Sequence, residues 1–435
     1  MKKLVECVPN FSEGRDQNKI GDIVKQMSDV PGITVLDVDP GPDTNRTVVT
    51  IVGSPEAVGE AAFQGIKRAS EVLDMSQHSG THPRMGATDV CPFIPVSDVT
   101  IEECVELSKQ VGNRVGDELG IPVFLYEKSA QKDNRVKLPD IRKGEYEGLA
   151  EKLTDSNWKP DFGPAKLHIK AGATVMGCRE FLIAYNINLN TKDHRLATDI
   201  AFELREAGRS KRTPNPNSKN LLDGEIVRNE DGSPVKVPGM FKDVKGIGWY
   251  VDIYNRAQIS INFNNFKVST IHDVFDAACI LASERGIRVT GSELVGLIPL
   301  EAMLMAGRHY LNKQNRSVGV PTADIVECAV QSLGLNDVTE FDPNVKIIDY
   351  AVQSEDRPLM NLVGKEFVEE LSTNSPAPGG GSVSALVGAL GAALSSMVAA
   401  LSHEKKELLD LKPEMNEIGI EAQKLKDCLS FLVDE

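Results

Sequence analysis

Hydrophobic positions near the start of the chain follow the two-residue period of a strand in some segments and the 3.6-residue period of a helix in others. They predict a series of strands and helices. The residues Ile20, Ile23, Val24 and Met27 recur at helical spacing. Ser54 followed by Pro55 is a favourable helix start, since serine caps a helix and proline fits its first position. The predicted elements are a strand at 3–9, a helix at about 17–29, strands at 33–38 and 46–52, a helix from Pro55 to about Leu73, and an apolar strand at 90–96.

The same order of elements returns after residue 180. The predicted elements are a strand at 181–189, a helix at about 193–207, strands near 245–253 and 257–264, a helix at about 271–285, and a strand at 287–290. Each half therefore follows the order β-α-β-β-α-β. Two such units predict an α+β protein with duplicated ferredoxin-like subdomains, followed by an all-α helical segment.

The remaining segments divide the chain further. Residues 209–243 are rich in Pro, Asn, Lys, Asp and Gly and predict a surface insertion. Residues 296–332 are helical in pattern, and the connector after them has short strand-like pieces such as 345–348. The expected domains are 1–178 and 179–332 for the two α+β subdomains, 333–360 for a linker, and 361–435 for a partial helical domain.

The C-terminal segment contains a long uncharged tract. Residues 383–401 are apolar or small and long enough to span a membrane. Ala, Gly and Ser dominate it, and these residues favour the central helix of a tight soluble bundle over a membrane span. The Gly-rich turn at 379–381 could hold an anion at a helix N-terminus or serve as a close-packed turn.

Composition and charge exclude several classes of protein. The length of 435 residues predicts about three domains, and 41% hydrophobic with 26% charged residues is typical of a soluble globular protein. A formal charge of −15 argues against non-specific nucleic-acid binding. Seven cysteines without a CxxC spacing indicate reduced thiols, and the N-terminus does not resemble a signal peptide. We therefore expect a cytoplasmic protein without disulfides that binds neither nucleic acid nor membrane.

The densest candidate chemistry lies at 77–96. Pro83 and Gly86 keep this segment out of helical geometry. Imidazole is the side chain whose ordinary pKa lies nearest neutrality, so a histidine in a loop beside Arg and Asp is a candidate proton carrier. His82 is favoured over His78 because Pro83 fixes the backbone directly after it.

Two other readings of these histidines stay open. His78 and His82 are four residues apart, as in helix-borne metal pairs, but Ser79 stands where a zinc hydrolase would have Glu. Either histidine could also be purely structural. Proton transfer is the favoured interpretation.

Other loops could join this site. The segments 8–15 and 38–46 carry polar and charged groups, among them Asp39, Asp43 and Arg46, although ordinary turns use the same residues. The segment 163–172 alternates Lys, His and Lys. An extended backbone would place these three basic groups on one face, suited either to carboxylates or to guarding an edge strand.

Several of these motifs together resemble the formiminotransferase family. They are VPNFSEGR at 8–15, HSGTHPRMGATDVCPFIPV at 78–96, GATVMGCREFLIAYNINL at 172–189, KGIGWY at 245–250 and GSELVGLIPLEAM at 291–303. The tract SPAPGGGSVSALVGALGAALSSMV at 375–398 resembles the start of formimidoyltetrahydrofolate cyclodeaminase. The resemblance covers the whole chain in that order.

The resemblance implies transfer of a formimidoyl group from N-formimidoyl-L-glutamate to the 5-position nitrogen of tetrahydrofolate. The products are 5-formimidoyltetrahydrofolate and L-glutamate, in histidine degradation. His82 matches the family's catalytic histidine. Tetrahydrofolate, with or without a polyglutamate tail, is the implied co-substrate, and no metal is expected. The implied folate-binding residues are Gly163, Pro164, Ala165, Lys166, Leu167, His168, Ile169, Lys170, Ala171 and Gly172.

The chain departs from better-known family members at Lys166 to Lys170 and in the insertion at 211–240. Our mechanistic hypothesis gives His82 the role of general base and then acid. Asp39 steadies the cationic amidine, and Arg46 or Arg84 holds a substrate carboxylate.

The family's deaminase module is a helical bundle that assembles its active site in an oligomer. Asp434 falls near that module's catalytic aspartate, but the helices expected after it are not in this sequence. We therefore expect a homo-oligomer without cyclodeaminase activity. The alternative to an enzyme is a non-catalytic folate-binding or assembly module.

Overall fold

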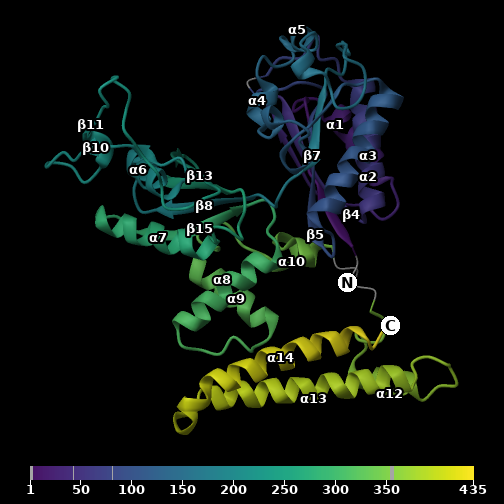
Figure 1. The fold of residues 1–435 in the computed structure, drawn as a ribbon. Coiled ribbons are helices and arrows are strands. Elements are labelled where there is room, and N and C mark those ends of the chain that lie inside the picture. Colours follow the sequence, from purple (N-terminus) through teal and green to yellow (C-terminus); the bar gives the residue numbers. More distant parts are fainter. Residues whose placement is uncertain (1–2, 43, 81, 353–356) are drawn as a thin grey trace. The chain divides into compact units, whose positions relative to one another are not determined.

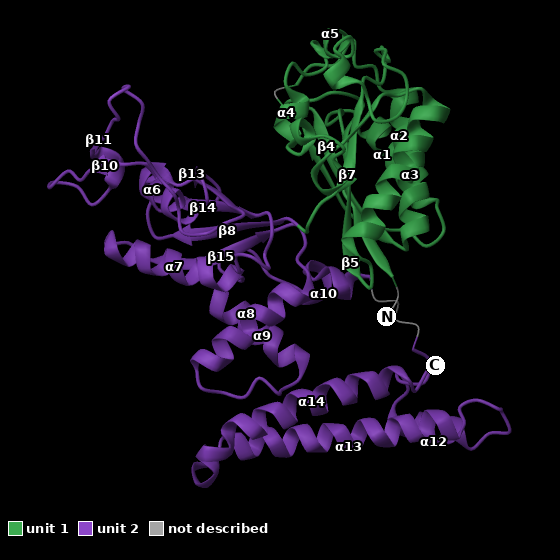
Figure 2. Ribbon diagram, viewed as in Figure 1, with its two compact units in different colours: residues 1–181 green, residues 182–435 purple. Residues whose placement is uncertain are grey.

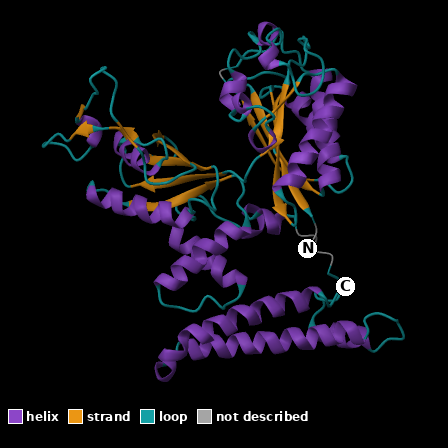
Figure 3. Cartoon of the chain, in the orientation of Figure 1, coloured by secondary structure: helices purple, strands orange, loops and turns teal. Residues whose placement is uncertain are grey.

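The computed structural model describes residues 3–42, 44–80, 82–352 and 357–435 and divides into two units, 1–181 and 182–435 (Figure 2). Asp43 and Thr81 from the candidate loops lie outside the described residues. Strands and helices are mixed as far as β15 (Val289–Val295), and the named elements in the described residues after it are all helices (Figure 3). This agrees with the predicted mixed α and β part followed by a helical segment.

Unit 1 is built on a seven-stranded sheet with the order β1-β4-β2-β5-β7-β6, in which β3 pairs with β4 (Figure 1). The strands are β1 (Leu4–Cys7), β2 (Asn10–Phe11), β3 (Thr34–Gly41), β4 (Arg46–Gly53), β5 (Thr88–Ser97), β6 (Val123–Leu125) and β7 (Thr174–Cys178). Both β1 and β2 pair with β4 on one side and β5 on the other. The strand expected at 3–9 is therefore two strands in one position of the sheet, interrupted around Pro9, which lacks a backbone N–H.

Three helices pack on one face of this sheet. They are α1 (Gln17–Ser28), α2 (Pro55–Val72) and α3 (Ile101–Leu119). The side chain of Ser54 accepts a hydrogen bond from the backbone N–H of Ala57, and Pro55 occupies the first turn of α2, as predicted. Ile23, Ala62 and Val111 from the three helices share one core with strand residues.

A second, smaller core lies on the opposite face of the sheet. Val90 and Val175 contribute to it, whereas their neighbours Cys91 and Met176 point to the helix-side core. The short helices α4 (Leu138–Arg142) and α5 (Leu149–Lys152) add Ile141 and Leu149 to it. On this face β4 presents Arg46 and Thr50 together with Val48 and Val52, and the candidate site lies at its Arg46 end.

Unit 2 contains a four-stranded antiparallel sheet of order β13-β14-β8-β15. The strands are β8 (Ile183–Leu189), β13 (Val244–Val251), β14 (Arg256–Phe263) and β15 (Val289–Val295). The helices between them are α6 (His194–Leu204) and α7 (Ile271–Glu284). All six elements were predicted, with β15 extending several residues beyond its expected end.

The insertion at 209–243 folds into short paired strands. They are β9 (Arg209–Ser210) with β12 (Lys236–Val237), and β10 (Arg212–Thr213) with β11 (Glu225–Ile226). After the sheet come α8 (Leu300–Lys313) and α9 (Thr322–Leu333).

The strand-like prediction at 345–348 holds only at Ile347, which forms a parallel β-bridge with Ile298, and is wrong for the rest. The structure has two short helices there, α10 (Pro343–Lys346) and α11 (Ile348–Ala351). Asp342 caps the first by accepting from the N–H of Asn344. A short apolar run does not by its pattern distinguish a strand from a helical turn, and this cap decides the outcome.

The C-terminal helices are α12 (Gly364–Leu371), α13 (Gly380–His403) and α14 (Lys412–Phe431), and α13 and α14 lie side by side (Figure 1). Helix α13 is long and apolar enough to cross a membrane by length and composition, which for a single helix is weak evidence. Only 17% of its most apolar window is buried. The expected central helix of a bundle is thus packed on one side, and Leu390, Leu394 and Leu401 are exposed on the other.

Candidate active site

The candidate site is organised around a buried ion pair between two strands. Arg46 is the first residue of β4, and its Nη1 lies 2.5 Å from Oδ2 of Asp89 on β5. Asp89 is fully buried. The same Oδ2 also accepts a hydrogen bond from Arg142, and Oδ1 accepts from the backbone N–H of Met85 at 2.9 Å. Two guanidinium groups on one carboxylate leave the cluster with a net positive charge.

An irregularity in the sheet explains how Asp89 reaches this position. Asn10 pairs with Val90 and Phe11 with Thr88, so Asp89 is an extra residue on β5. Such a bulge breaks the strict alternation of side chains and turns one of them to a new direction. Asn10 also fixes Arg46, since its Oδ1 accepts from Nε at 3.0 Å and from Nη2 at 2.7 Å.

His82 lies beside this pair. Its Nδ1 is 2.7 Å from the carbonyl oxygen of Pro83 and 3.3 Å from Nη1 of Arg46. A carbonyl oxygen can only accept, so the shorter contact requires a proton on Nδ1. In the neutral ring the lone pair is then on Nε2. Partial burial, and next the positive charge of Arg46, lower the pKa of His82. The ring is therefore neutral at physiological pH, and its basic Nε2 has no hydrogen-bond partner among the residues that the structure describes.

His78 has a different environment. Its Nε2 lies 3.1 Å from the carbonyl oxygen of Asn45, and its Nδ1 accepts a hydrogen bond from Nε of Arg84 at 3.2 Å. Both ring nitrogens are therefore engaged within the chain. Burial lowers the pKa of this histidine as well. The arrangement suits a structural histidine that ties the loop to β4, and it leaves no nitrogen of His78 free for a metal ion.

Arg84 is likewise already paired. Its guanidinium donates to Glu147 Oε1 at 2.6 Å and to Glu145 Oε2 at 2.9 Å, and these hydrogen bonds raise its pKa. The same three residues line a pocket together with His78, Ser79, Gly80 and Gly144. A substrate carboxylate would have to displace one of these glutamates from Arg84; Arg46 is also paired, with Asp89 and Asn10, but lies next to His82.

Asp39 lies on the same face of the sheet as Arg46. It is exposed on β3 and pairs in register with Val48, two residues along β4 from Arg46. The neighbouring Val38 and Val49 pack into the helix-side core, so Asp39 and Arg46 point the other way. The structure therefore brings Asp39 to the correct face, near the edge of the site.

The segment 163–172 is a loop, and the prediction of an extended strand with three basic groups on one face is wrong. His168 turns back on the chain, because its Nδ1 accepts from the backbone N–H of Ala171 at 3.0 Å. Lys166 and Lys170 are exposed. The hydroxyl of Tyr146 donates to the carbonyl of Ile169 at 2.6 Å and holds the turn.

This loop contacts the histidine loop directly. Gly86 and Gly172 form a β-bridge, and the N–H of Ala87 donates to the carbonyl of Ala171 at 2.9 Å. A Cβ atom on Gly172 would lie 2.2 Å from the carbonyl oxygen of Met85, and its φ of +67° favours glycine. Glycine at positions 86 and 172 therefore allows the backbones of the two loops to come into contact.

Sequence reasoning missed Arg142 and the role of Asn10. Arg142 ends α4 and reaches Asp89 across 53 residues of sequence. No local signal marks it among the charged residues around it. Asn10 lies in a motif noted from the sequence, but its contact with Arg46 depends on the pairing of β2 with β4.

Comparison with known proteins matches three successive segments of the chain to the family that the sequence motifs resemble. Residues 4–179 match the formiminotransferase domain, N-terminal subdomain; residues 184–353 match the formiminotransferase domain; and residues 364–435 match formiminotransferase-cyclodeaminase. The formimidoyltransferase-cyclodeaminase of Dictyostelium discoideum is 48% identical over 96% of this chain and 74% of its own length. That of Mus musculus is 45% identical, with coverage of 96% and 73%.

A shorter relative covers the two α+β subdomains. The glutamate formimidoyltransferase of Streptococcus pyogenes serotype M1 is 41% identical over 72% of this chain and 95% of its own length. The resemblance drawn from the motifs is confirmed, and the chain belongs to the formiminotransferase family, with a formiminotransferase-cyclodeaminase segment at its C-terminal end.

Proposed function

We propose that this chain is a glutamate formimidoyltransferase that moves the formimidoyl group from N-formimidoyl-L-glutamate to the 5-position nitrogen of tetrahydrofolate. Relatives that cover 96% and 72% of the chain are named formimidoyltransferase-cyclodeaminase and glutamate formimidoyltransferase. The observation that carries the proposal is the state of His82. Its Nδ1 contacts the Pro83 carbonyl, its Nε2 is unpaired within the described part of the chain, and a lowered pKa keeps the ring neutral.

His82 acts first as a base and then as an acid. The folate nitrogen attacks the amidine carbon, a new C–N bond forms, and the attacking nitrogen becomes positively charged. Nε2 of His82 takes the proton from this nitrogen. The protonated ring then gives the proton to the nitrogen of the glutamate moiety as the old C–N bond breaks. Proton transfer of this kind contributes about a hundred- to ten-thousandfold in rate.

The charges around His82 suit an anionic donor substrate. Arg46 and Arg142 share the single carboxylate of Asp89, so the cluster is locally positive in a chain of formal charge −15. A local positive field is needed to hold a dicarboxylate against such a net charge. In this proposal Arg46 binds a carboxylate of the glutamate moiety, and Asp39 faces the cationic amidine.

Tetrahydrofolate binds along 163–172 in this proposal. The β-bridge between Gly86 and Gly172 supports the assignment, because it places this loop beside the proton carrier. Lys166 and Lys170 are exposed and could pair with carboxylates of the folate tail, including a polyglutamate tail. The reaction as proposed uses only these side chains and the two substrates.

We further propose that both α+β subdomains have the ferredoxin-like arrangement, with domains at 1–178, 179–332 and 361–435 and a linker at 333–360. In unit 1, β1 lies between β4 and β5, and β3 lies outside β4. In unit 2, β8 lies between β14 and β15, and β13 lies outside β14. We also propose that the protein is a homo-oligomer, and the apolar side chains exposed on α13 support this. We propose that it is located in the cytoplasm.

The experiment is glutamate release from N-formimidoyl-L-glutamate by the purified chain, with and without tetrahydrofolate. We expect release only with the folate, and a loss of about a hundredfold or more in His82→Ala. His194→Ala, an exposed histidine at the start of α6, is the matched control and should keep full activity. Folate binding without any release by the folded wild type would favour the non-catalytic binding module.

A further inference from the structure

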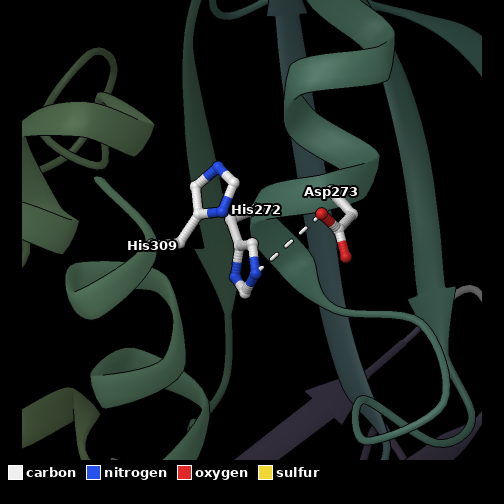
Figure 4. Close-up of side chains that lie close together, drawn as sticks. All are labelled: His272, Asp273 and His309. Atoms are coloured by element: carbon white, nitrogen blue, oxygen red, sulfur yellow. Dashed lines mark ion pairs between the residues drawn. The ribbon is translucent and has the colours of Figure 1, made fainter. Parts of the chain in front are cut away.

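Two histidines meet in unit 2 on helices that the proposed reaction does not use. His272 is the second residue of α7, and His309 lies in the last turns of α8. Their ring centroids are 4.3 Å apart with an angle of 28° between the planes. Figure 4 shows the two rings one above the other, with Asp273 to the side of His272. The potential ligand atoms of His272, Asp273 and His309 all lie within 4.8 Å of one another.

The ring of His309 is oriented by a carboxylate behind it. Its Nε2 lies 3.0 Å from Oδ2 of Asp276, which also accepts from Lys313 Nζ at 2.7 Å. A charged carboxylate requires the proton of His309 on Nε2, so that Nδ1 keeps its lone pair. Metal-binding histidines commonly donate their second N–H to a carboxylate in this way. Lys313 balances the charge of Asp276.

His272 is buried, with 8% of its surface exposed, yet one of its nitrogens is unused. Its Nδ1 has no hydrogen-bond partner among the residues that the structure describes. Its Nε2 lies 4.0 Å from Oδ1 of Asp273, which is too long for a hydrogen bond. Buried polar atoms normally have a partner, so this ring points to a ligand.

We propose that His272, His309 and Asp273 form a binding site for a divalent transition-metal ion of the zinc, cobalt or nickel type. Two imidazole nitrogens and one carboxylate oxygen are the donors that such ions prefer, and water would complete the coordination. Calcium and magnesium are disfavoured because they select oxygen donors. The lone pairs of stacked rings do not converge, so binding turns the ring of His272, which makes no hydrogen bond to a described residue, while Asp276 keeps His309 in place. The ion would then join α7 to α8.

The test is titration of the full-length, metal-free chain with Co²⁺, followed by visible absorption. We expect ligand-field bands that saturate at one ion per chain and are lost in His309→Ala. This variant removes the partly exposed ring and is the one least disruptive to folding. His272→Ala should also lose the bands, and Asp276→Asn should weaken binding about 10- to 100-fold. The control His194→Ala should bind like wild type.

Three outcomes would overturn the proposal. One is the absence of any saturable band, which would leave His272 and His309 as a stacked structural pair. The second is a band that persists in His309→Ala. The third is a thiolate-to-cobalt charge-transfer band, which would assign binding to cysteines such as Cys328 or Cys428. Circular dichroism of each variant establishes that a lost band does not reflect unfolding.

Discussion

Arg46 and Asp89 form an ion pair that joins β4 to β5 in a buried position, with Nη1 and Oδ2 2.5 Å apart. The same Nη1 is 3.3 Å from the ring of His82. The pair therefore has two effects. It stabilises the contact between the two strands, and it places a charge beside the proposed proton carrier His82. These two effects can be separated by substitution.

Replacing Asp89 tests the structural effect. Asp89→Asn leaves Arg46 and Arg142 without their shared negative partner, and removal of one partner of a buried ion pair costs about 3–5 kcal/mol. We expect this loss in the free energy of unfolding measured with urea. Asp39→Asn, on the exposed part of the same sheet face, should change it by less than about 0.5 kcal/mol. Equal effects of the two substitutions would contradict the central role of the ion pair.

The pH dependence of the reaction tests the chemical effect. His82 must be neutral to accept a proton, and burial and Arg46 lower its pKa below the ordinary value of 6.5. The specificity constant kcat/KM should therefore stay high as the pH falls to 6.5 and decline only at lower pH. Arg46→Gln removes one positive charge and should shift the decline to higher pH. A profile that stays flat from pH 5 to 8 would rule out His82 as the base.

The contact between the two loops gives a third prediction. In Gly172→Ala the new Cβ would lie 2.2 Å from the Met85 carbonyl oxygen, so the loops must separate. We expect a raised KM for tetrahydrofolate. Gly232→Ala is a matched control, since Gly232 also has a positive φ but no atom within 4 Å of the new Cβ. It should cost about 1–2 kcal/mol or less in stability and leave KM unchanged.

The exposed side of α13 gives a fourth prediction. Leu390, Leu394 and Leu401 present an apolar surface, and burial of such surface drives association. Leu394→Glu should lower the oligomer mass measured by light scattering. Ser395→Glu adds the same charge at a neighbouring exposed polar position and should leave the mass unchanged. An oligomer that survives Leu394→Glu would place its interface elsewhere.

Much of the fold could be predicted from the sequence because local signals agree with the tertiary structure. The start of α2 is an example, where Ser54 caps and Pro55 begins the helix. The failures have physical reasons. The run at 345–348 is too short for its period to be decisive, and a cap makes it helical. The loop at 163–172 alternates in sequence, but His168 bonds to its own backbone and bends the chain.

The candidate site was predicted in part for a related reason. His82, Asp39 and Arg46 come from loops and strand ends whose composition is visible in the sequence. Asp89 enters the site through a bulge, and its partner Arg142 arrives from α4 across 53 residues. A bulge breaks the period of two, and a long-range ion pair depends on which elements become neighbours, so local hydrophobic periodicity reveals neither.

The β-bridge between Gly86 and Gly172 has a consequence for motion. Because these backbones are in contact and also hydrogen-bonded through Ala87 and Ala171, the C-terminal end of the histidine loop moves together with the C-terminal end of the loop at 163–172. The offset between the proton carrier and the proposed folate loop is then set when the chain folds, and substrate arrival does not have to create it.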